Sequence, residues 1–328
     1  MRLGYKLMSE EIGPRELVTN AARAEDAGFD FAAISDHFLP WADAQGHAPF
    51  IWSVLGSIAN ATEQIGLMTA VTCPSFRYHP AIVAQATATM SLLAGSRFRL
   101  GLGSGERLNE HVVGGGWPSV SVRQKRLEEA IDIIRMLLEG GVCSYRGLHF
   151  ELERARLFDL PDDRPRILVA AGGPHAARIA ATRGDGLMAT RPRRELVEAY
   201  VDAGGDGPRC VEISLCWAES TEAAVATMLR YARWSPLDWS VLPELETPGS
   251  FDEASRSVRP DDLSEMAHGP EVDRYLAAID SYLDAGFDEF VLHQIGPEQE
   301  GFLQFFEEEL APALRRHAPD AERHRMRA

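Results

Sequence analysis

Short apolar runs alternate with longer amphipathic segments along most of the chain, and this alternation limits the fold more than any other feature. The first unit shows the pattern: an apolar strand at residues 3–7 is followed by a helix predicted over 14–27, which opens with Pro14 and ends before Gly28. Strands and helices that alternate in this way are typical of parallel sheets covered by helices. The sequence therefore predicts an α/β protein.

Eight buried strands can be placed by this pattern. They span residues 3–7, 31–34, 65–71, 98–102, 167–171, 186–189, 211–216 and 290–293. Helical periodicity is clearest at 123–138, 271–285 and 302–316. Eight such units favour a (β/α)8 TIM barrel, with a doubly wound sheet as the alternative because periodicity alone does not separate the two. Residues 1–328 are thus expected to form one barrel domain, with a polar insertion at about 234–268 after the seventh strand.

The composition excludes several kinds of partner and location. The net charge is −16, so no basic surface for nucleic acid is expected. No apolar stretch approaches the roughly 20 residues of a membrane-spanning helix, and the N-terminus lacks the pattern of a signal peptide. The four cysteines show no zinc spacing and fit a reducing compartment. The sequence predicts a cytoplasmic protein without a metal, which binds neither nucleic acid nor membrane.

Several polar residues follow the predicted strands, at the rim where barrel active sites form. Asp36, His37 and Trp41 come after the second strand, and Glu106 follows the glycine-rich end of the fourth. His37 is a candidate proton acceptor oriented by Asp36, the alternative being an N-cap aspartate beside a half-buried histidine. Glu106 either faces the barrel mouth or stabilises the first turn of a helix, and Trp41 either lines a pocket or belongs to the core.

Two glycines after the fifth strand indicate an anion site. Gly172 and Gly173 precede a helix that begins near Pro174, which leaves backbone N–H groups free beside the glycines. The alternative is a turn that needs glycine only for its geometry. After the sixth strand, either Arg191 or Arg193 could meet an anionic group of a substrate.

Five strings of residues resemble a single family. They are Ser35-Asp36-His37-Phe38-x-Pro40-Trp41, Gly46-His47-Ala48-Pro49-Phe50, Phe76-Arg77-Tyr78-x-Pro80-Ala81, Gly101-x-Gly103-Ser104-Gly105-Glu106-x-Leu108-Asn109-Glu110 and Ala170-Ala171-Gly172-Gly173-Pro174. In this order they resemble the coenzyme F420-dependent glucose-6-phosphate dehydrogenases of the bacterial-luciferase-like superfamily. The resemblance runs from Gly4 to about Ala203 and resumes from Pro270 to Leu314. It implies a (β/α)8 barrel, usually a homodimer, that binds F420, a deazaflavin which exchanges hydride with substrate at C5.

The resemblance also implies the roles of individual residues. The implied cofactor contacts are Asp36, Cys73, Ser104, Gly105, Asn109, Gly172, Gly173, His175 and Ala176, together with a non-prolyl cis peptide at Ala70–Val71. By the same resemblance His37 takes the proton of the substrate hydroxyl and Trp41 helps to hold the developing charge. Glu106 manages the ring proton of the cofactor, and Glu10 matches a further acid of the active site.

The substrate follows less directly from the resemblance. Thr190, Arg193 and Arg274 fall at substrate-binding positions, where the two arginines would hold a phosphate. A second phosphate-binding lysine has no counterpart because no lysine follows Lys125, and Cys73 replaces the usual threonine, as in secondary-alcohol dehydrogenases of the family. Sugar-6-phosphate dehydrogenation, chiefly of glucose 6-phosphate, is the main prediction. The alternatives are an F420-dependent secondary-alcohol dehydrogenase or ketone/enone reductase, a flavin-dependent monooxygenase, and a non-catalytic F420-binding barrel.

Overall fold

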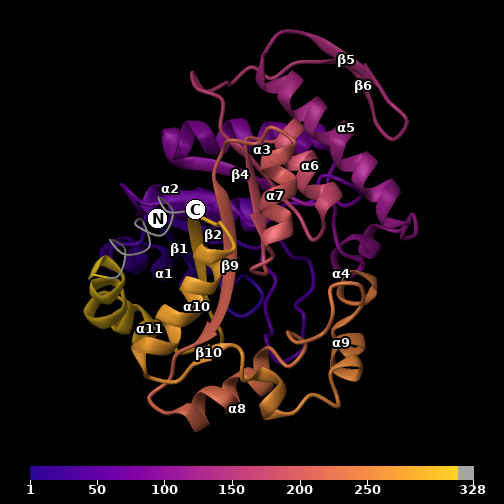
Figure 1. The fold of residues 1–328 in the computed structure, drawn as a ribbon. Helices are drawn as coiled ribbons and strands as arrows, with labels where there is room; N and C mark the ends of the chain where they lie inside the picture. The colour runs from indigo at the N-terminus through magenta and orange to yellow at the C-terminus, as the bar shows by residue number, and fades with distance from the viewer. Residues whose placement is uncertain (317–328) are drawn as a thin grey trace.

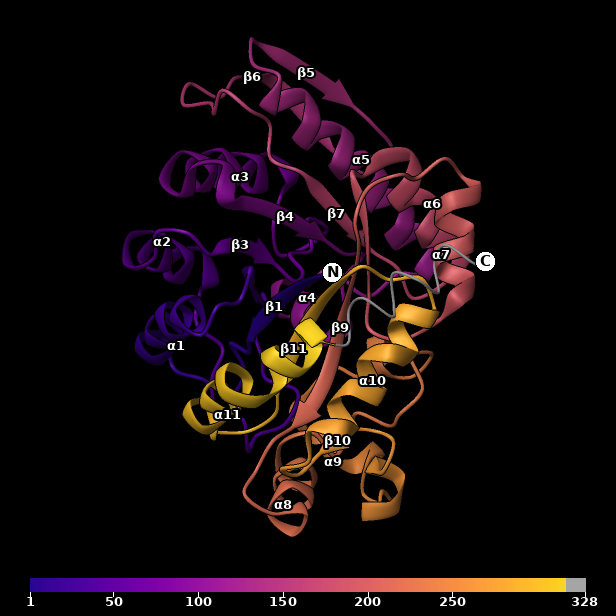
Figure 2. The same cartoon turned by 60° about the vertical axis from the view of Figure 1, so that its left-hand side comes forward.

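The computed structural model describes residues 1–316, in which eight parallel strands close into a barrel (Figures 1 and 2). The barrel strands are β1 (Arg2–Leu7), β2 (Phe31–Ile34), β3 (Gly66–Thr69), β4 (Phe98–Leu102), β7 (Ile167–Ala170), β8 (Gly186–Ala189), β9 (Arg209–Cys216) and β11 (Glu289–Gln294). Each strand pairs with the next, and the pairing of β11 with β1 completes the circle. The predicted (β/α)8 TIM barrel is confirmed, and the doubly wound alternative was wrong.

Helices surround the strands, as Figure 2 shows. They are α1 (Pro14–Asp26), α2 (Ile51–Ala61), α3 (Pro80–Ala94), α4 (Arg107–Glu110), α5 (Val120–Leu138), α6 (Pro174–Arg183), α7 (Arg194–Asp202), α8 (Thr221–Tyr231), α9 (Pro248–Ala254), α10 (Val272–Asp284) and α11 (Gln299–Phe305). A π-helical turn, Phe306–Leu310, follows α11 within the helix predicted over 302–316. None of the helices in residues 1–316 is long and apolar enough to cross a bilayer.

Apolar side chains close the amino-terminal half of the barrel interior. Phe31 of β2, Met68 of β3 and Leu168 of β7 belong to one buried apolar cluster inside the barrel. Gly4 lies opposite Phe31 in the β1–β2 ladder, and a Cβ at that position would come within 2.4 Å of the phenyl ring. The missing side chain thus makes room for Phe31. Since this end is filled, space for a ligand is left only toward the carboxyl ends of the strands.

An antiparallel hairpin stands outside the repeating units. It consists of β5 (Cys143–Arg146) and β6 (Glu151–Ala155), and Figure 1 shows it beyond α5 at the edge of the molecule. The sequence analysis did not predict this hairpin, because its strands are short, polar and mostly exposed and so lack a continuous apolar run.

The segment predicted as an insertion packs onto the rim of the barrel. Between α8 and α10 it contains 3-10 helices at Leu242–Glu244 and Pro260–Leu263, the helix α9, and a short strand β10 (Ala267–His268) that pairs with the end of β9. Leu242 and Phe251 from this segment join Trp41 in a small apolar cluster. The segment therefore builds part of the wall around the barrel mouth.

Candidate active site

A cavity of about 1420 Å³ opens at the carboxyl ends of the strands. Most of the predicted site residues line it, namely Glu10, Asp36, His37, Trp41, Ala70, Val71, Cys73, Ser104, Gly105, Glu106, Asn109, Gly172, Gly173, Ala176 and Thr190. His175, Arg193 and Arg274 lie outside this lining. Residues from at least five strand ends thus meet in one space, as expected for the rim of a barrel.

His37 lies just beyond β2, and each of its ring nitrogens faces a carboxyl group. Nδ1 is 3.2 Å from Oε1 of Glu10 and 3.2 Å from the carbonyl oxygen of Leu39. Nε2 is 3.6 Å from Oε2 of Glu106. Both neighbours of Nδ1 are acceptors, so neutral His37 carries its proton on Nδ1 and keeps a lone pair on Nε2. The geometry prepares Nε2 to accept a proton.

Asp36 does not orient His37, and the hypothesis that it does was wrong. Its carboxylate instead accepts hydrogen bonds from Thr72 Oγ1 at 2.7 Å, Arg77 Nη2 at 3.0 Å and the Tyr78 hydroxyl at 3.2 Å. The Asp36 carboxylate is thus directed to the segment that follows β3 rather than to His37. Glu10, fully buried after β1, faces His37 in its place.

The two carboxyl groups beside His37 have pKa values shifted in opposite directions. Burial raises the pKa of Glu106, and the nearby charge of Glu10 adds to this effect, although His37 opposes it. Burial also acts to raise the pKa of Glu10, but His37, Lys6 and a hydrogen bond from Ser35 outweigh it, so the pKa is lowered. Such a divergence fits one charged group that orients the imidazole and one neutral group that can donate a proton.

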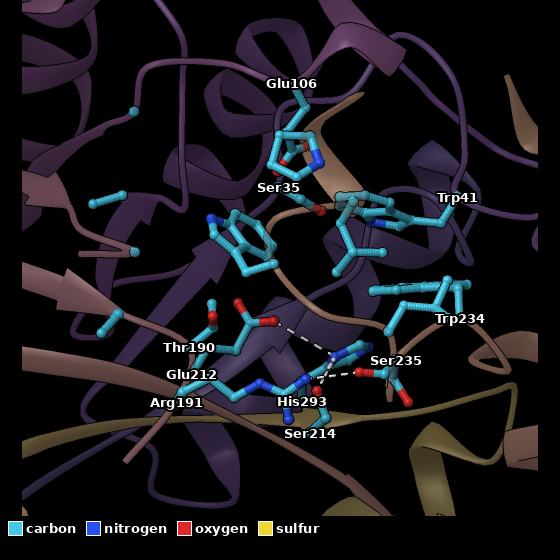
Figure 3. A pocket seen from close by; sticks show the side chains of 18 of the residues that line it. Ser35, Trp41, Glu106, Thr190, Arg191, Glu212, Ser214, Trp234, Ser235 and His293 are labelled. Carbon is cyan, nitrogen blue, oxygen red and sulfur yellow. Dashed lines mark hydrogen bonds and ion pairs between the residues drawn. The ribbon is translucent and has the colours of Figure 1, made fainter. Parts of the chain in front are cut away.

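Trp41 forms an aromatic wall together with the insertion. Its ring stacks on Trp234 with centroids 4.5 Å apart, and Phe251 meets it edge-on at 5.1 Å. Figure 3 shows Trp41 and Trp234 lying side by side at the cavity. The His37 ring lies 4.8 Å from Trp41. Trp41 is therefore both packed in an apolar cluster and part of the pocket, so the two interpretations of this residue are compatible.

A chain of hydrogen bonds that the sequence did not reveal fixes the backbone at Trp41. The N–H groups of Trp41 and Ala42 donate to Oε1 of Gln45, at 2.8 and 3.1 Å. Nε2 of Gln45 donates to Oε1 of Glu11 at 3.0 Å, and the N–H of Gly296 donates to Oε2 of Glu11 at 2.7 Å. The loops after β1, β2 and β11 are joined in this way.

The turn after β7 and the segment after β3 offer different surfaces to a ligand. Gly173 is the N-cap of α6 and no side chain among residues 1–316 caps this helix, which leaves N–H groups of the first turn for an anion. Ala70 and Val71 present apolar surface to the cavity. The peptide bond between them is cis, as the resemblance implied.

A second polar cluster lies inside the barrel and was not predicted. Lys6 Nζ donates to Oε2 of Glu212 at 2.6 Å and to the carbonyl oxygen of Ala70 at 3.0 Å. His293 Nδ1 lies 3.6 Å from Oε1 of Glu212 and 3.4 Å from Ser214 Oγ. Figure 3 shows Glu212, Ser214 and His293 grouped together, apart from Glu106 and Trp41. The members come from β1, β9 and β11, so no local sequence pattern could have joined them.

The two arginines predicted to bind substrate have protein partners. Arg193 pairs with Glu195 at 2.6 Å and donates from Nη1 to the carbonyl oxygen of Gly172, at the edge of the cavity, at 3.0 Å. Arg274 lies 3.2 Å from Nε2 of His268. Arg191 lines the cavity instead and donates from Nη2 to the carbonyl oxygen of Ser235 at 2.8 Å. The roles of Arg193 and Arg274 stay predictions. Within residues 1–316 no group of three or more His, Cys, Asp or Glu side chains is placed to hold a metal ion.

This chain is similar to proteins that use F420. The model of the family "Luciferase-like monooxygenase" matches residues 1–300. Proteins named F420-dependent glucose-6-phosphate dehydrogenase from Amycolatopsis mediterranei (strain U-32) and Kribbella flavida are 37% and 38% identical, over 96% of this chain and 99% of each relative. A solved F420-dependent secondary alcohol dehydrogenase, in complex with an F420-acetone adduct, has a TM-score of 0.87 at 28% identity, over 94% of this chain and 97% of that chain.

Proposed function

The chain belongs to the luciferase-like monooxygenase family, and we propose that within it the protein is an F420-dependent dehydrogenase that oxidises a hydroxyl-bearing carbon of its substrate. The observation that carries this proposal is the position of His37 at the cavity, with Nδ1 against the carbonyl oxygen of Leu39 and the carboxylate of Glu10, which leaves Nε2 to accept a proton. Glucose 6-phosphate is the first substrate to consider, because relatives at 37% and 38% identity are named for its oxidation.

The residues at the cavity fit coenzyme F420. The free N–H groups after Gly172 and Gly173 suit the anionic side chain of the cofactor. Ala70 and Val71 give an apolar support for a flat ring. The further contacts proposed are Asp36, Cys73, Ser104, Gly105, Asn109 and Ala176, with His175 at the exposed start of α6. When bound, F420 supplies the acceptor for the hydride, and the barrel supplies position and electrostatics.

In the proposed reaction, His37 takes the proton of the substrate hydroxyl at Nε2 as the carbon loses its hydrogen with the bonding electron pair and the carbonyl forms. The carbonyl oxygen of Leu39 keeps Nδ1–H oriented, and the nearby Glu10 carboxylate stabilises the resulting imidazolium. Trp41 excludes water from one side of the reacting oxygen. Glu106, whose raised pKa favours the neutral carboxyl, holds a proton that it can donate beside Nε2.

A secondary-alcohol dehydrogenase is the second candidate, and ketone or enone reduction is the same chemistry in reverse. Two observations favour it. Arg193 and Arg274 lie outside the cavity lining, which weakens the case for a bound phosphate. Cys73 lines the cavity, and burial raises the pKa of its thiol, so it offers a weak neutral donor where a threonine would offer a hydroxyl.

The test is the loss of the visible absorbance of F420 with glucose 6-phosphate and with isopropanol, each supplied alone. Bleaching by the sugar phosphate supports the main proposal, and bleaching only by isopropanol supports the second candidate. If F420 binds without bleaching, the reduced cofactor is assayed with acetone to test the reverse direction. Failure of F420 to bind, measured by its fluorescence, overturns both candidates, and FMN binding would then point to a flavin-dependent enzyme.

We further propose that the protein is a cytoplasmic homodimer. The support is the family resemblance, in which dimers are usual, together with an acidic sequence whose cysteines form no paired motif. Light scattering of the purified protein tests the dimer, with a mass of 36.1 kDa expected for a single chain. A single species at that mass would contradict it.

A further inference from the structure

Glu11 is surrounded by hydrogen-bond donors, although it lies outside the predicted site. Its Oε1 accepts from the amide nitrogen of Gln45 and its Oε2 accepts from the N–H of Gly296. A carboxylate accepts strongly at both oxygens, whereas in a protonated carboxyl one oxygen becomes a hydroxyl, which accepts more weakly and must direct its hydrogen away from the donor in front of it. The contacts around Glu11 therefore favour its ionised form.

Gln45 connects Glu11 to the backbone of Trp41 by hydrogen bonds. Its amide oxygen accepts from the N–H groups of Trp41 and Ala42, so its NH2 group must face Glu11. Gln45 is buried and cannot exchange these partners for water. If the amide turned to suit a proton on Glu11, its NH2 group would face the two backbone donors of the Trp41 loop. The whole chain of contacts thus has one satisfied arrangement.

We propose that Glu11 is a positioning residue, which as a carboxylate fixes the backbone of Trp41 through Gln45 and so sets the indole against His37 and the cavity. The indole contacts His37 directly, with ring centroids 4.8 Å apart. The role of the indole in turnover rests on the proposed function, while its position is a property of the protein without any ligand.

The ionisation of Glu11 falls in an accessible pH range. Burial raises its pKa to about 7, although the hydrogen bonds from Gly296 and Gln45 lower it. The titratable groups that face it are Glu10 on the same segment, Tyr5 of β1 and Cys216 of β9. Below this range the carboxyl gains a proton and one of its two contacts is weakened, so the position of Trp41 is expected to depend on pH.

Exchange of the two side chains provides the sharpest test. In the single variant Glu11→Gln, the amide oxygen at position 11 can accept from either Gln45 or Gly296 but not from both. The NH2 group at position 11 then faces the other of these two donors, and that hydrogen bond is lost. In the double variant Glu11→Gln/Gln45→Glu, the amide now at position 11 would accept from Gly296 and donate to the carboxylate now at position 45. That carboxylate would in turn accept from the Trp41 loop, so all the contacts are restored with the charge moved to the other position. The double variant is expected to restore the Trp41 fluorescence and the turnover only if both depend on the hydrogen bonds to the Trp41 loop.

Two readouts are compared at pH 8. The fluorescence of Trp41 in the protein without cofactor, taken as the difference from Trp41→Phe, should shift in Glu11→Gln and return in the double variant. Turnover should fall by about tenfold or more in the single variant and recover in the double variant. The wild-type fluorescence should move toward that of Glu11→Gln as the pH falls through 7. The fluorescence arm needs neither substrate nor cofactor and therefore fails or succeeds independently of the proposed function.

Glu25→Gln is the matched control. Like Glu11, Glu25 is a carboxylate that accepts hydrogen bonds from backbone N–H groups, here those of residues 63–65. It lies at the opposite end of the barrel from Trp41. The substitution should lower the melting temperature without changing the Trp41 signal. The proposal is overturned if Glu11→Gln leaves the Trp41 fluorescence at pH 8 unchanged, if the double variant is no better than the single one, or if Glu25→Gln gives the same shift.

Discussion

Two histidines line the cavity, the half-buried His37 and the buried His293, and their surroundings differ in charge. His37 has a carboxyl group at each ring nitrogen, and those groups have pKa values moved in opposite directions. His293 shares a single carboxylate, Glu212, with the ammonium group of Lys6. Burial lowers the pKa of His293, with Lys6 acting in the same direction and Glu212 against it.

The difference indicates which neighbouring charges allow a histidine inside a barrel to take up a proton. At His37 the Glu10 carboxylate is available to stabilise the imidazolium, and a second carboxyl group lies at the proton-accepting nitrogen. At His293 the corresponding charge is already neutralised by Lys6, so protonation would leave an excess positive charge inside the protein. We expect His37 to change its charge during turnover and His293 to stay neutral.

Loss of Lys6 should have the largest effect. The Lys6→Met variant leaves the half-buried Glu212 without its cation, and the loss should approach the roughly 3 kcal/mol at the lower end for broken buried pairs, because Glu212 keeps some contact with solvent in the cavity. Denaturant unfolding measures the loss. Lys6→Met/Glu212→Gln should recover most of it, because neither charge is then left alone. A single variant as stable as the wild type would show that the pair is not a structural necessity.

His37→Ala should lower turnover by about 100-fold or more, since it removes the proton acceptor. The affinity for F420, followed by fluorescence titration, should change little because the other proposed contacts stay in place. Unchanged turnover would exclude the proton-accepting role. The same substitution at His293 is the internal control and should have a much smaller effect on the pH dependence of turnover.

The opposite pKa shifts at Glu10 and Glu106 predict opposite pH dependence of stability. The lowered pKa of Glu10 means that its ionised form stabilises the fold at neutral pH, and this contribution is lost as the pH falls through the acidic range. The raised pKa of Glu106 means that its contribution is present at low pH and lost as the pH rises. Unfolding free energies of Glu10→Gln and Glu106→Gln, each compared with wild type across pH 3–8, should therefore diverge in opposite directions. Parallel curves would contradict the division of roles.

His293→Gln should have the smallest effect. Glutamine keeps a donor for Glu212 and Ser214, and it introduces no charge. Turnover within about threefold of wild type is expected, because this histidine takes no proton in the proposed reaction. A loss as large as that of His37→Ala would show that the two histidines act together.

The sequence predicted the barrel strands well because each is a short apolar run between helices. The contacts that the sequence analysis missed or assigned wrongly join residues that are far apart in the sequence. The Lys6–Glu212 pair joins residues 206 positions apart, and neither has a neighbour in the sequence that signals the contact. Asp36 was assigned to His37 because they are adjacent, yet its carboxylate binds Thr72 and Arg77 of the segment after β3, which are distant in the sequence.

The position of the substrate-binding residues was harder to predict than that of the proton-transfer residues. Glu106 follows a strand end by a few residues, so its place on the rim follows from the barrel alone. Arg193 follows the end of β8 at the same distance along the chain, yet its side chain pairs with Glu195 in the next helix. The path of such a loop depends on local turns and ion pairs that periodicity does not encode.

The aromatic wall has a consequence for how proteins of this kind diverge. His37 and Trp41 belong to the barrel, whereas Trp234 and Phe251, which pack on Trp41, belong to the segment at 234–268. The shape of the cavity on that side is therefore determined by a different segment from the one that carries the groups that move protons. Mutations in this one segment can change which molecules are accepted while the chemistry is kept, and a new specificity can evolve without rebuilding the catalytic centre.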